Sequence, residues 1–167
     1  MTSYLWLGLS GNVDRFGGGD ENLHCDRSHF RTDVCVARGD VRVLPRSAES
    51  SDYRVIVKAQ GGRNRQETLR PYTRKWEESV MKTIDSVVIQ REVVDRTGTG
   101  TGTDKNDGPD ICDVRHDIPA IVFSTGGYTG NVYHEFNDGL IPLFLTAGAY
   151  KGEVVLMVLE YHSWWIT

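Results

Sequence analysis

A histidine and an aspartate in the last third of the sequence have the spacing of a general-base pair. His134 and Asp138 are four residues apart and share one face if this segment is helical, whereas Glu135 and Asn137 point elsewhere. An aspartate within hydrogen-bond range orients an imidazole and raises its basicity, so the pair could deprotonate a hydroxyl group. The alternative is that His134 only packs or caps the helix while Asp138 is solvated, and the spacing alone favours this alternative.

A glycine-rich segment lies directly before this pair. Residues 124–131 read STGGYTGN, and their three glycines would let the backbone approach a ligand closely. Free amides at the start of a following helix favour anionic groups, and Asn131 is suited to cap that helix. The spacing is not that of a dinucleotide-binding loop, so a tight strand-to-helix turn is an equal alternative.

The elements around the glycine-rich segment predict a βαβ unit. Residues 120–123 and 153–161 are apolar runs that predict buried strands, and residues 132–146 between them predict a helix. Gly139 and Pro142 fall inside that helix and predict a kink or two pieces. In a βαβ unit a ligand usually binds beyond the carboxyl end of the first strand, where the glycine-rich segment lies. The sequence therefore predicts an α/β fold with its site at this edge.

The rest of the chain gives weaker signals. Residues 1–24 are glycine-rich without a sustained period and predict a loose leader. Residues 40–44 and 53–59 predict short strands, and residues 75–88 place apolar side chains at helical spacing. Residues 96–110 alternate glycine and threonine, which predicts a flexible surface loop; a phosphate-binding loop is the alternative, but the required spacing is missing.

Composition excludes several classes of protein. The 167 residues are 39% hydrophobic and 25% charged, as in one globular domain, and the net charge of -4 argues against a nucleic-acid partner. No apolar run approaches the ~20 residues of a membrane-spanning helix, and the first ten residues lack the basic start of a signal peptide. Trp164 and Trp165 fit either a sugar-stacking platform or a core anchor, and burial is the commoner fate.

Three cysteines, Cys25, Cys35 and Cys112, allow one disulfide and one free thiol. Metal binding with nearby histidines is the alternative, but no C-x-x-C pair occurs and the spacing fits no common zinc site. Since no D-x-D run occurs either, the sequence makes no cofactor evident and leaves metal dependence open.

Four blocks of the sequence together resemble the plant form of glycosyltransferase family 61. The most specific is PAIVFSTGGYTGNVYHEFNDGLIPLFLT at residues 119–146. The other three, at residues 25–43, 69–81 and 153–167, are similar to blocks of that family in the same order. Residues 25–167 are therefore interpreted as a partial domain of this family.

The resemblance implies an inverting transferase of the Golgi with a GT-B-type fold of two Rossmann-like domains. Plant members similar to this chain transfer xylose or arabinose from a UDP-sugar to xylan, and others modify glycans on proteins. By the same resemblance His134 and Asp138 are candidates for general-base catalysis or acceptor orientation. The candidate ligand contacts are Gly126, Gly127, Tyr128, Thr129, Gly130, Asn131 and Glu135.

Family members are longer than this chain, so the resemblance also implies a truncated protein. The second Rossmann-like domain, which usually holds the nucleotide, would be missing, and the chain alone is expected to be inactive. The main rival is a non-catalytic module that binds a carbohydrate or a nucleotide-sugar. Two further rivals are an unstable fragment and an unrelated βαβ nucleotide-binding domain.

Overall fold

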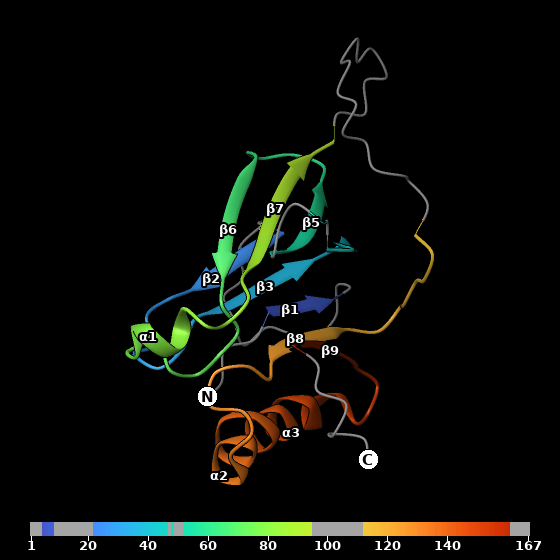
Figure 1. Ribbon diagram of the computed structural model, residues 1–167. Coiled ribbons are helices and arrows are strands. Elements are labelled where there is room, and N and C mark those ends of the chain that lie inside the picture. The colour runs from blue at the N-terminus through green and yellow to red at the C-terminus, as the bar shows by residue number, and fades with distance from the viewer. Residues whose placement is uncertain (1–4, 9–21, 47, 49–51, 95–111, 161–167) are drawn as a thin grey trace.

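The computed structural model describes residues 5–8, 22–46, 48, 52–94 and 112–160 of the chain. The predicted loop at residues 96–110 and the tryptophans Trp164 and Trp165 lie outside these described residues. Two mixed β-sheets and a short helical segment make up the described part (Figure 1). The predicted α/β class is thereby confirmed.

The first sheet has five strands and contains the predicted βαβ unit. Its spatial order is β2 (Leu23–Asp26), β3 (Val34–Arg38), β1 (Leu5–Gly8), β8 (Ala120–Ser124) and β9 (Val155–Leu159). β8 and β9 run parallel, as expected for two strands joined through a helical segment. β1 is parallel to β3 and antiparallel to β8, so it joins the two halves of the sheet.

The second sheet has four strands from the middle of the chain. Its order is β4 (Asp40–Leu44), β5 (Tyr53–Ala59), β7 (Val87–Val93) and β6 (Arg65–Leu69). The predicted strands at residues 40–44 and 53–59 are thus confirmed. β5 and β7 run parallel, whereas β4 and β6 pair antiparallel on the two sides.

The predicted helix at residues 132–146 is present in consecutive pieces. They are α2 (Val132–His134), the π-helical turn η1 (Glu135–Leu140), α3 (Ile141–Ala147) and the 3-10 turn η2 (Gly148–Tyr150). Gly139 lies within the π-helical turn, and Pro142 lies in the first turn of α3. Pro142 has no N–H to donate to a carbonyl of the preceding turn, and that turn is π-helical instead of regular α-helix. The predicted interruption is confirmed.

Alternating side chains of β8 show that the molecule has three layers. Val122 packs into a core shared with Ile89 of the second sheet. Ile121 and Phe123, on the opposite face, pack against Leu143 of α3. Successive side chains of a strand point to opposite faces, so the first sheet lies between the second sheet and the helices (Figure 1). The candidate site forms where a loop of the second sheet meets the start of α2.

The predicted amphipathic helix at residues 75–88 is wrong. Only one turn is helical, α1 (Glu78–Met81), and β7 begins at Val87. Val87 and Ile89 are fully buried and alternate with half-buried residues, which is the period of a strand. The apolar side chains have helical spacing only because a single helical turn lies close before a strand that is rich in valine and isoleucine. Burial between the two sheets makes the residues from Val87 onward a strand.

The prediction of a loose leader at residues 1–24 also differs from the structure. β1 lies inside this range and is the central strand of the first sheet, and β2 begins at Leu23, which is fully buried. The sequence of β1, LWLG, is mostly apolar, as expected for a strand with a neighbour on each side. Four residues are too few to show the period of a strand, and a glycine-rich stretch follows them.

Cys25 and Cys35 form the disulfide that the cysteine count allowed. They are directly opposite each other on β2 and β3, with 4.0 Å between their Cα atoms, and Cys112 is free. Among the described residues no three histidine, cysteine or acidic side chains are grouped to hold a metal ion. No helix in the described part of the chain is long and apolar enough to cross a membrane.

Candidate functional site

The glycine-rich segment connects β8 to α2, as predicted, and its own contacts hold it in place. The Thr125 amide donates to the Leu159 carbonyl of β9 at 3.2 Å, which ties the segment to the sheet. The Gly130 amide donates to the Glu135 carboxylate at 2.6 Å. Asn131 caps α2, since its side-chain oxygen accepts the Tyr133 N–H at 3.0 Å. The predicted N-cap is confirmed.

The glycines of this segment approach side chains of the protein itself. Gly127 has a φ of +70°, and a Cβ atom there would lie 2.8 Å from the Tyr72 ring. A Cβ atom at Gly126 would overlap the Glu160 carboxylate. The Tyr128 amide donates to the Tyr72 hydroxyl at 3.2 Å. Because the amides of Tyr128 and Gly130 are already bonded, the segment offers fewer free N–H groups to an anion than the sequence implied.

His134 and Asp138 lie side by side one helical turn beyond the segment. Nδ1 of His134 is 2.8 Å from a carboxylate oxygen of Asp138. Asp138 is only 1% exposed, so the alternative of a solvated aspartate is wrong. Asn137, expected to point elsewhere, donates its amide N–H to the other Asp138 oxygen at 3.0 Å. Glu135 does point away and is occupied in holding the glycine-rich segment.

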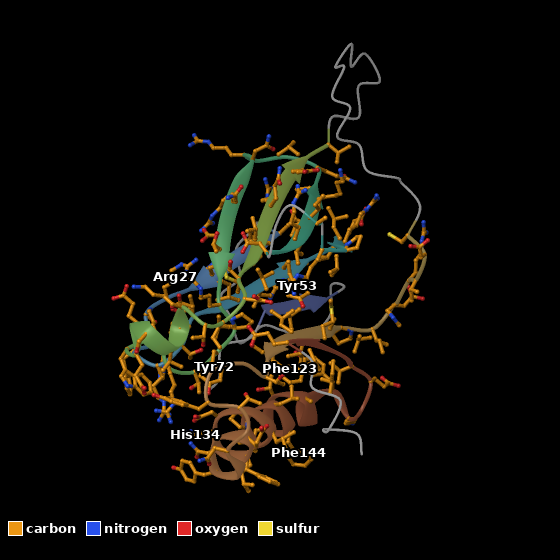
Figure 2. All side chains as sticks on the ribbon, in the orientation of Figure 1. Arg27, Tyr53, Tyr72, Phe123, His134 and Phe144 are labelled. Carbon is orange, nitrogen blue, oxygen red and sulfur yellow. A yellow bond between two sulfur atoms is a disulfide. The ribbon has the colours of Figure 1, made fainter. Side chains whose placement is uncertain are left out.

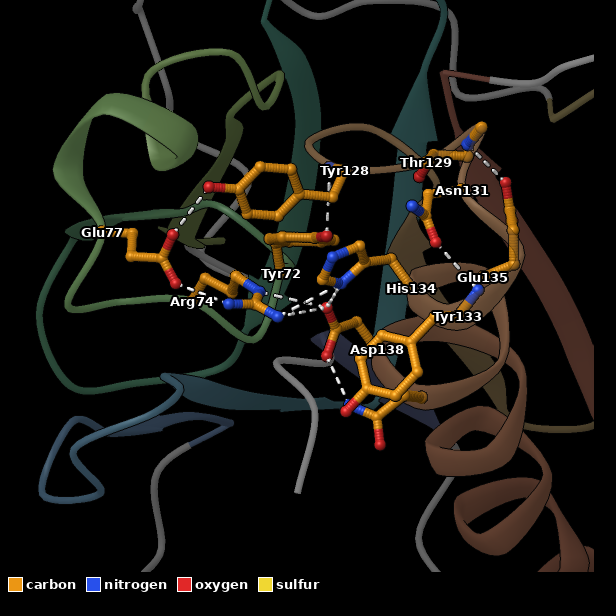
Figure 3. A network of polar contacts seen from close by, with 12 residues as sticks. Tyr72, Arg74, Glu77, Tyr128, Thr129, Asn131, Tyr133, His134, Glu135 and Asp138 are labelled. Carbon is orange, nitrogen blue, oxygen red and sulfur yellow. Dashed lines mark hydrogen bonds and ion pairs between the residues drawn. The ribbon is translucent and has the colours of Figure 1, made fainter.

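Arg74 completes the cluster and was not identified from the sequence. Its Nε and Nη2 atoms each lie 3.0 Å from the same Asp138 oxygen, and its Nη1 donates to Glu77 at 2.6 Å (Figure 3). Burial alone would lower the pKa of Arg74, but the bonds to Glu77 and Asp138 outweigh burial and raise that pKa. The guanidinium is therefore charged at every relevant pH and compensates the buried carboxylate. The only sequence signal was that Arg74 lies in one of the blocks that carry the resemblance.

The geometry around Nδ1 of His134 indicates which nitrogen is basic. Nδ1 faces the Asp138 carboxylate at 2.8 Å and an Arg74 N–H at 3.2 Å. A carboxylate accepts and a guanidinium donates, so a neutral imidazole satisfies only one of them through Nδ1. The shorter contact assigns the proton to Nδ1, donated to Asp138. With this assignment Nε2 keeps its lone pair and is the acceptor nitrogen of the ring.

Tyrosine rings surround the imidazole. The Tyr128 ring stacks on His134 with 4.8 Å between ring centroids, and Tyr133 meets it edge-on at 5.2 Å. The Tyr128 hydroxyl donates to Glu77 at 2.9 Å, and this bond raises the pKa of Tyr128. The bonds from Arg74 and Tyr128 lower the pKa of Glu77, so Glu77 is ionised. Both tyrosines are exposed, at 40% and 65%, and present aromatic surface beside the candidate base.

Comparison with curated proteins finds plant glycosyltransferases. The xylan glycosyltransferase MUCI21 of Arabidopsis thaliana is 42% identical over 146 residues, which cover 87% of this chain and 28% of that protein. The rice β-1,2-xylosyltransferase XYXT1 is 37% identical over 158 residues, which cover 87% of this chain and 31% of that protein. The rice α-1,3-arabinosyltransferase XAT3 is 36% identical over 143 residues, which cover 84% of this chain and 22% of that protein. The chain is a homologue of plant xylan xylosyl- and arabinosyltransferases.

These matches confirm the resemblance that the sequence blocks predicted. The chain spans 28%, 31% and 22% of the lengths of the three relatives, which is less than a third of each. No family model matches the chain, and no solved structure matches it. The GT-B-type arrangement and the roles of the predicted site residues therefore stay predictions.

Proposed function

We propose that this chain supplies the acceptor-activating part of an inverting pentosyltransferase. The enzyme would transfer xylose or arabinose from a UDP-sugar to xylan or a related glycan in the Golgi. The homologues supply the reaction class, since they are named as xylosyl- and arabinosyltransferases. We assign the general base to His134 because its contact with the buried Asp138 orients the imidazole beside exposed aromatic rings.

The proposed reaction is a single displacement. Nε2 of His134 removes the proton from an acceptor hydroxyl, whose oxygen forms a bond to the anomeric carbon of the donor sugar. The bond between that carbon and the UDP oxygen breaks on the opposite side, and UDP leaves with the bonding electrons. Because attack and departure take place on opposite faces, the anomeric configuration inverts. General-base catalysis of this kind contributes typically ~10²–10⁴-fold to the rate.

Arg74 and two carboxylates form a charged cluster beside His134. The guanidinium of Arg74 is paired with two carboxylates, those of Asp138 and Glu77, so this cluster has one more negative than positive charge while His134 is neutral. In the proposed reaction, the proton that His134 takes from the acceptor brings the sum of these charges to zero. Asp138 also holds the ring through Nδ1 and accepts a stronger bond from the imidazolium. Asp138 is thus proposed as the residue that positions His134 and stabilises its charged form.

The glycine-rich segment is proposed to border the ligand rather than to enclose a phosphate. Its candidate contacts, Gly126 to Asn131, lie between Tyr72 and the start of α2, and Tyr128 is the member with an exposed ring beside His134. Glu135 acts through this segment, because its carboxylate holds the Gly130 amide. The UDP-sugar, the Golgi location and the two-domain GT-B-type architecture rest on the resemblance.

Replacing His134 tests the proposal. We would insert the chain in place of the matching segment of the Arabidopsis relative and measure pentose transfer from UDP-xylose and UDP-arabinose to xylo-oligosaccharides. His134→Ala should lower kcat by ~10²–10⁴-fold. The matched control is His24→Ala, which removes an exposed histidine of β2 and should leave kcat unchanged.

Unchanged turnover in the His134→Ala protein would remove this histidine from the catalytic role. An unsubstituted chimera that binds xylo-oligosaccharides without transferring a sugar would instead favour the non-catalytic binding module.

A further inference from the structure

Two loops from different sheets lie against each other next to the candidate site. One joins β2 to β3 at residues 27–33, and the other follows β6 at residues 70–77. The Lys75 amide donates to the Arg31 carbonyl at 3.1 Å, and the Lys75 ammonium donates to the Arg27 carbonyl at 2.8 Å. The same ammonium pairs with Asp33 at 2.6 Å. These bonds fix the relative position of the two loops and of the side chains at their tips.

The tips of these loops expose two neighbouring aromatic rings. Phe30 is 72% exposed and Trp76 is 49% exposed, with 6.1 Å between their ring centroids and 35° between their planes. The Arg31 guanidinium lies 5.2 Å from the Trp76 ring. Arg31 forms no ion pair with any carboxylate among the described residues, and its Nε is buried there without a hydrogen-bond partner. Large exposed aromatic area beside a cationic side chain is typical of a binding surface.

This aromatic surface continues into the candidate site. The Arg74 guanidinium lies 5.8 Å from the Trp76 ring and 5.0 Å from the Tyr128 ring. Tyr128 in turn stacks on His134. We call this row of side chains, from Phe30 through Trp76 and Tyr128 to His134, the aromatic strip. Figure 3 shows its inner part, where Arg74 lies between Tyr128 and Asp138.

We infer that the outer end of the aromatic strip, formed by Phe30 and Trp76, binds sugar rings of an extended acceptor glycan. A pyranose ring has a face of C–H groups that stacks on an aromatic ring, and a rim of hydroxyl oxygens that accept hydrogen bonds. Phe30 and Trp76 offer the rings, and the Arg31 guanidinium lies beside the Trp76 ring. An acceptor held there would extend along the strip toward Nε2 of His134.

The exposed side chains of α3 show what distinguishes the aromatic strip from an ordinary apolar face. Ile141, Phe144 and Leu145 are 51%, 75% and 70% exposed, and two of these three are aliphatic. Branched aliphatic side chains present no flat surface for a sugar ring. Phe144 is also as exposed as Phe30, yet it lies on the helical layer (Figure 2). Phe144 is therefore the matched control for a loss of exposed aromatic area.

The inference is tested by binding. It rests on the proposed function for the identity of the acceptor, so we would titrate the 167-residue chain with xylohexaose in a calorimeter. Trp76→Ala and Phe30→Ala should each weaken binding about tenfold, which corresponds to ~1.4 kcal/mol, while Phe144→Ala should bind like the unsubstituted chain. Thermal melting of each protein would verify that it is folded.

Three results of the titration would overturn the inference. They are the absence of xylohexaose binding by the unsubstituted chain, unchanged binding by folded Trp76→Ala and Phe30→Ala proteins, and an equal loss in Phe144→Ala. Self-association that is lost in Trp76→Ala, without any glycan binding, would likewise overturn it and assign the strip to a protein partner. A failure of the proposed function would be seen in a different experiment, as full turnover by the His134→Ala chimera. In the same chimera, Trp76→Ala should raise the KM for the acceptor and leave kcat unchanged.

Discussion

Removal of Arg74 should destabilise the fold, because Arg74 compensates the buried charge of Asp138. Asp138 is 1% exposed and the Arg74 side chain 16% exposed, so Arg74→Met leaves a buried carboxylate without its cation. Removal of one member of a buried pair costs ~3–5 kcal/mol. Asp138 keeps its bonds to Asn137 and His134, so we expect the lower end, about 3 kcal/mol. For a domain of this size that corresponds to a fall in Tm of roughly 6–12 °C.

The assay is urea unfolding followed by tryptophan fluorescence, with three further proteins beside Arg74→Met. Arg42→Met is the matched control: its partner Asp40 is 51% exposed, and such surface pairs contribute less than ~1 kcal/mol. Asp138→Asn completes a double-mutant cycle. The protein with both Arg74→Met and Asp138→Asn contains no unpaired buried charge and should be more stable than Arg74→Met alone.

Two outcomes would refute this reasoning about Arg74. One is a loss in Arg74→Met no larger than that in Arg42→Met. The other is strict additivity of the two changes, because residues that share a buried ion pair are coupled by at least ~0.5 kcal/mol.

Two further predictions concern the glycine-rich segment and the ion pairs of β6. Gly127→Ala and Gly130→Ala both place a methyl group at positive φ, but only at Gly127 would that group meet the Tyr72 ring, at 2.8 Å. Gly127→Ala should therefore lower the free energy of unfolding in urea by ~1–3 kcal/mol more than Gly130→Ala does. Equal losses in the two proteins would contradict the contact with Tyr72. Burial alone would raise the pKa of Glu67, but its bonds to two arginines lower it below the unfolded value of 4.5. The stability from Glu67 is therefore present above that pH and lost as the pH falls through the folded pKa. Glu67→Gln should thus lower stability by less than ~1 kcal/mol at pH 7, and this difference should shrink as the pH falls below 4.5. A pH-independent difference would show that charge is not involved.

The local parts of the site could be predicted from the sequence because their signals are local. The pair His134 and Asp138 lies within one helical turn, so spacing alone places the two side chains together. The pieces of the helix follow from Gly139 and Pro142, whose backbone properties act wherever they stand. The short apolar run of β8 is followed by a glycine-rich segment, and this combination predicts a buried strand that ends there.

Other parts depend on packing between distant residues and gave no such signal. Arg74 bonds to Asp138 across 64 residues, and the contact exists only because the loop after β6 meets the start of α2. The same applies to the pairing of Phe30 with Trp76. β7 was mistaken for helix because its first residues fit both periods, and only burial between two sheets distinguishes them.

The position of β1 in the first sheet has a consequence for the order in which the chain folds during synthesis. All strands of the second sheet lie between Asp40 and Val93, so their hydrogen-bond partners leave the ribosome close together. β1 is made first, yet one of its two neighbours is β8, with Leu5 opposite Val122. Long-range pairing of this kind forms slowly and late. A nascent chain halted once Val93 has left the ribosome, but before β8 has, should therefore hold an assembled second sheet while β1 still presents an open edge to chaperones.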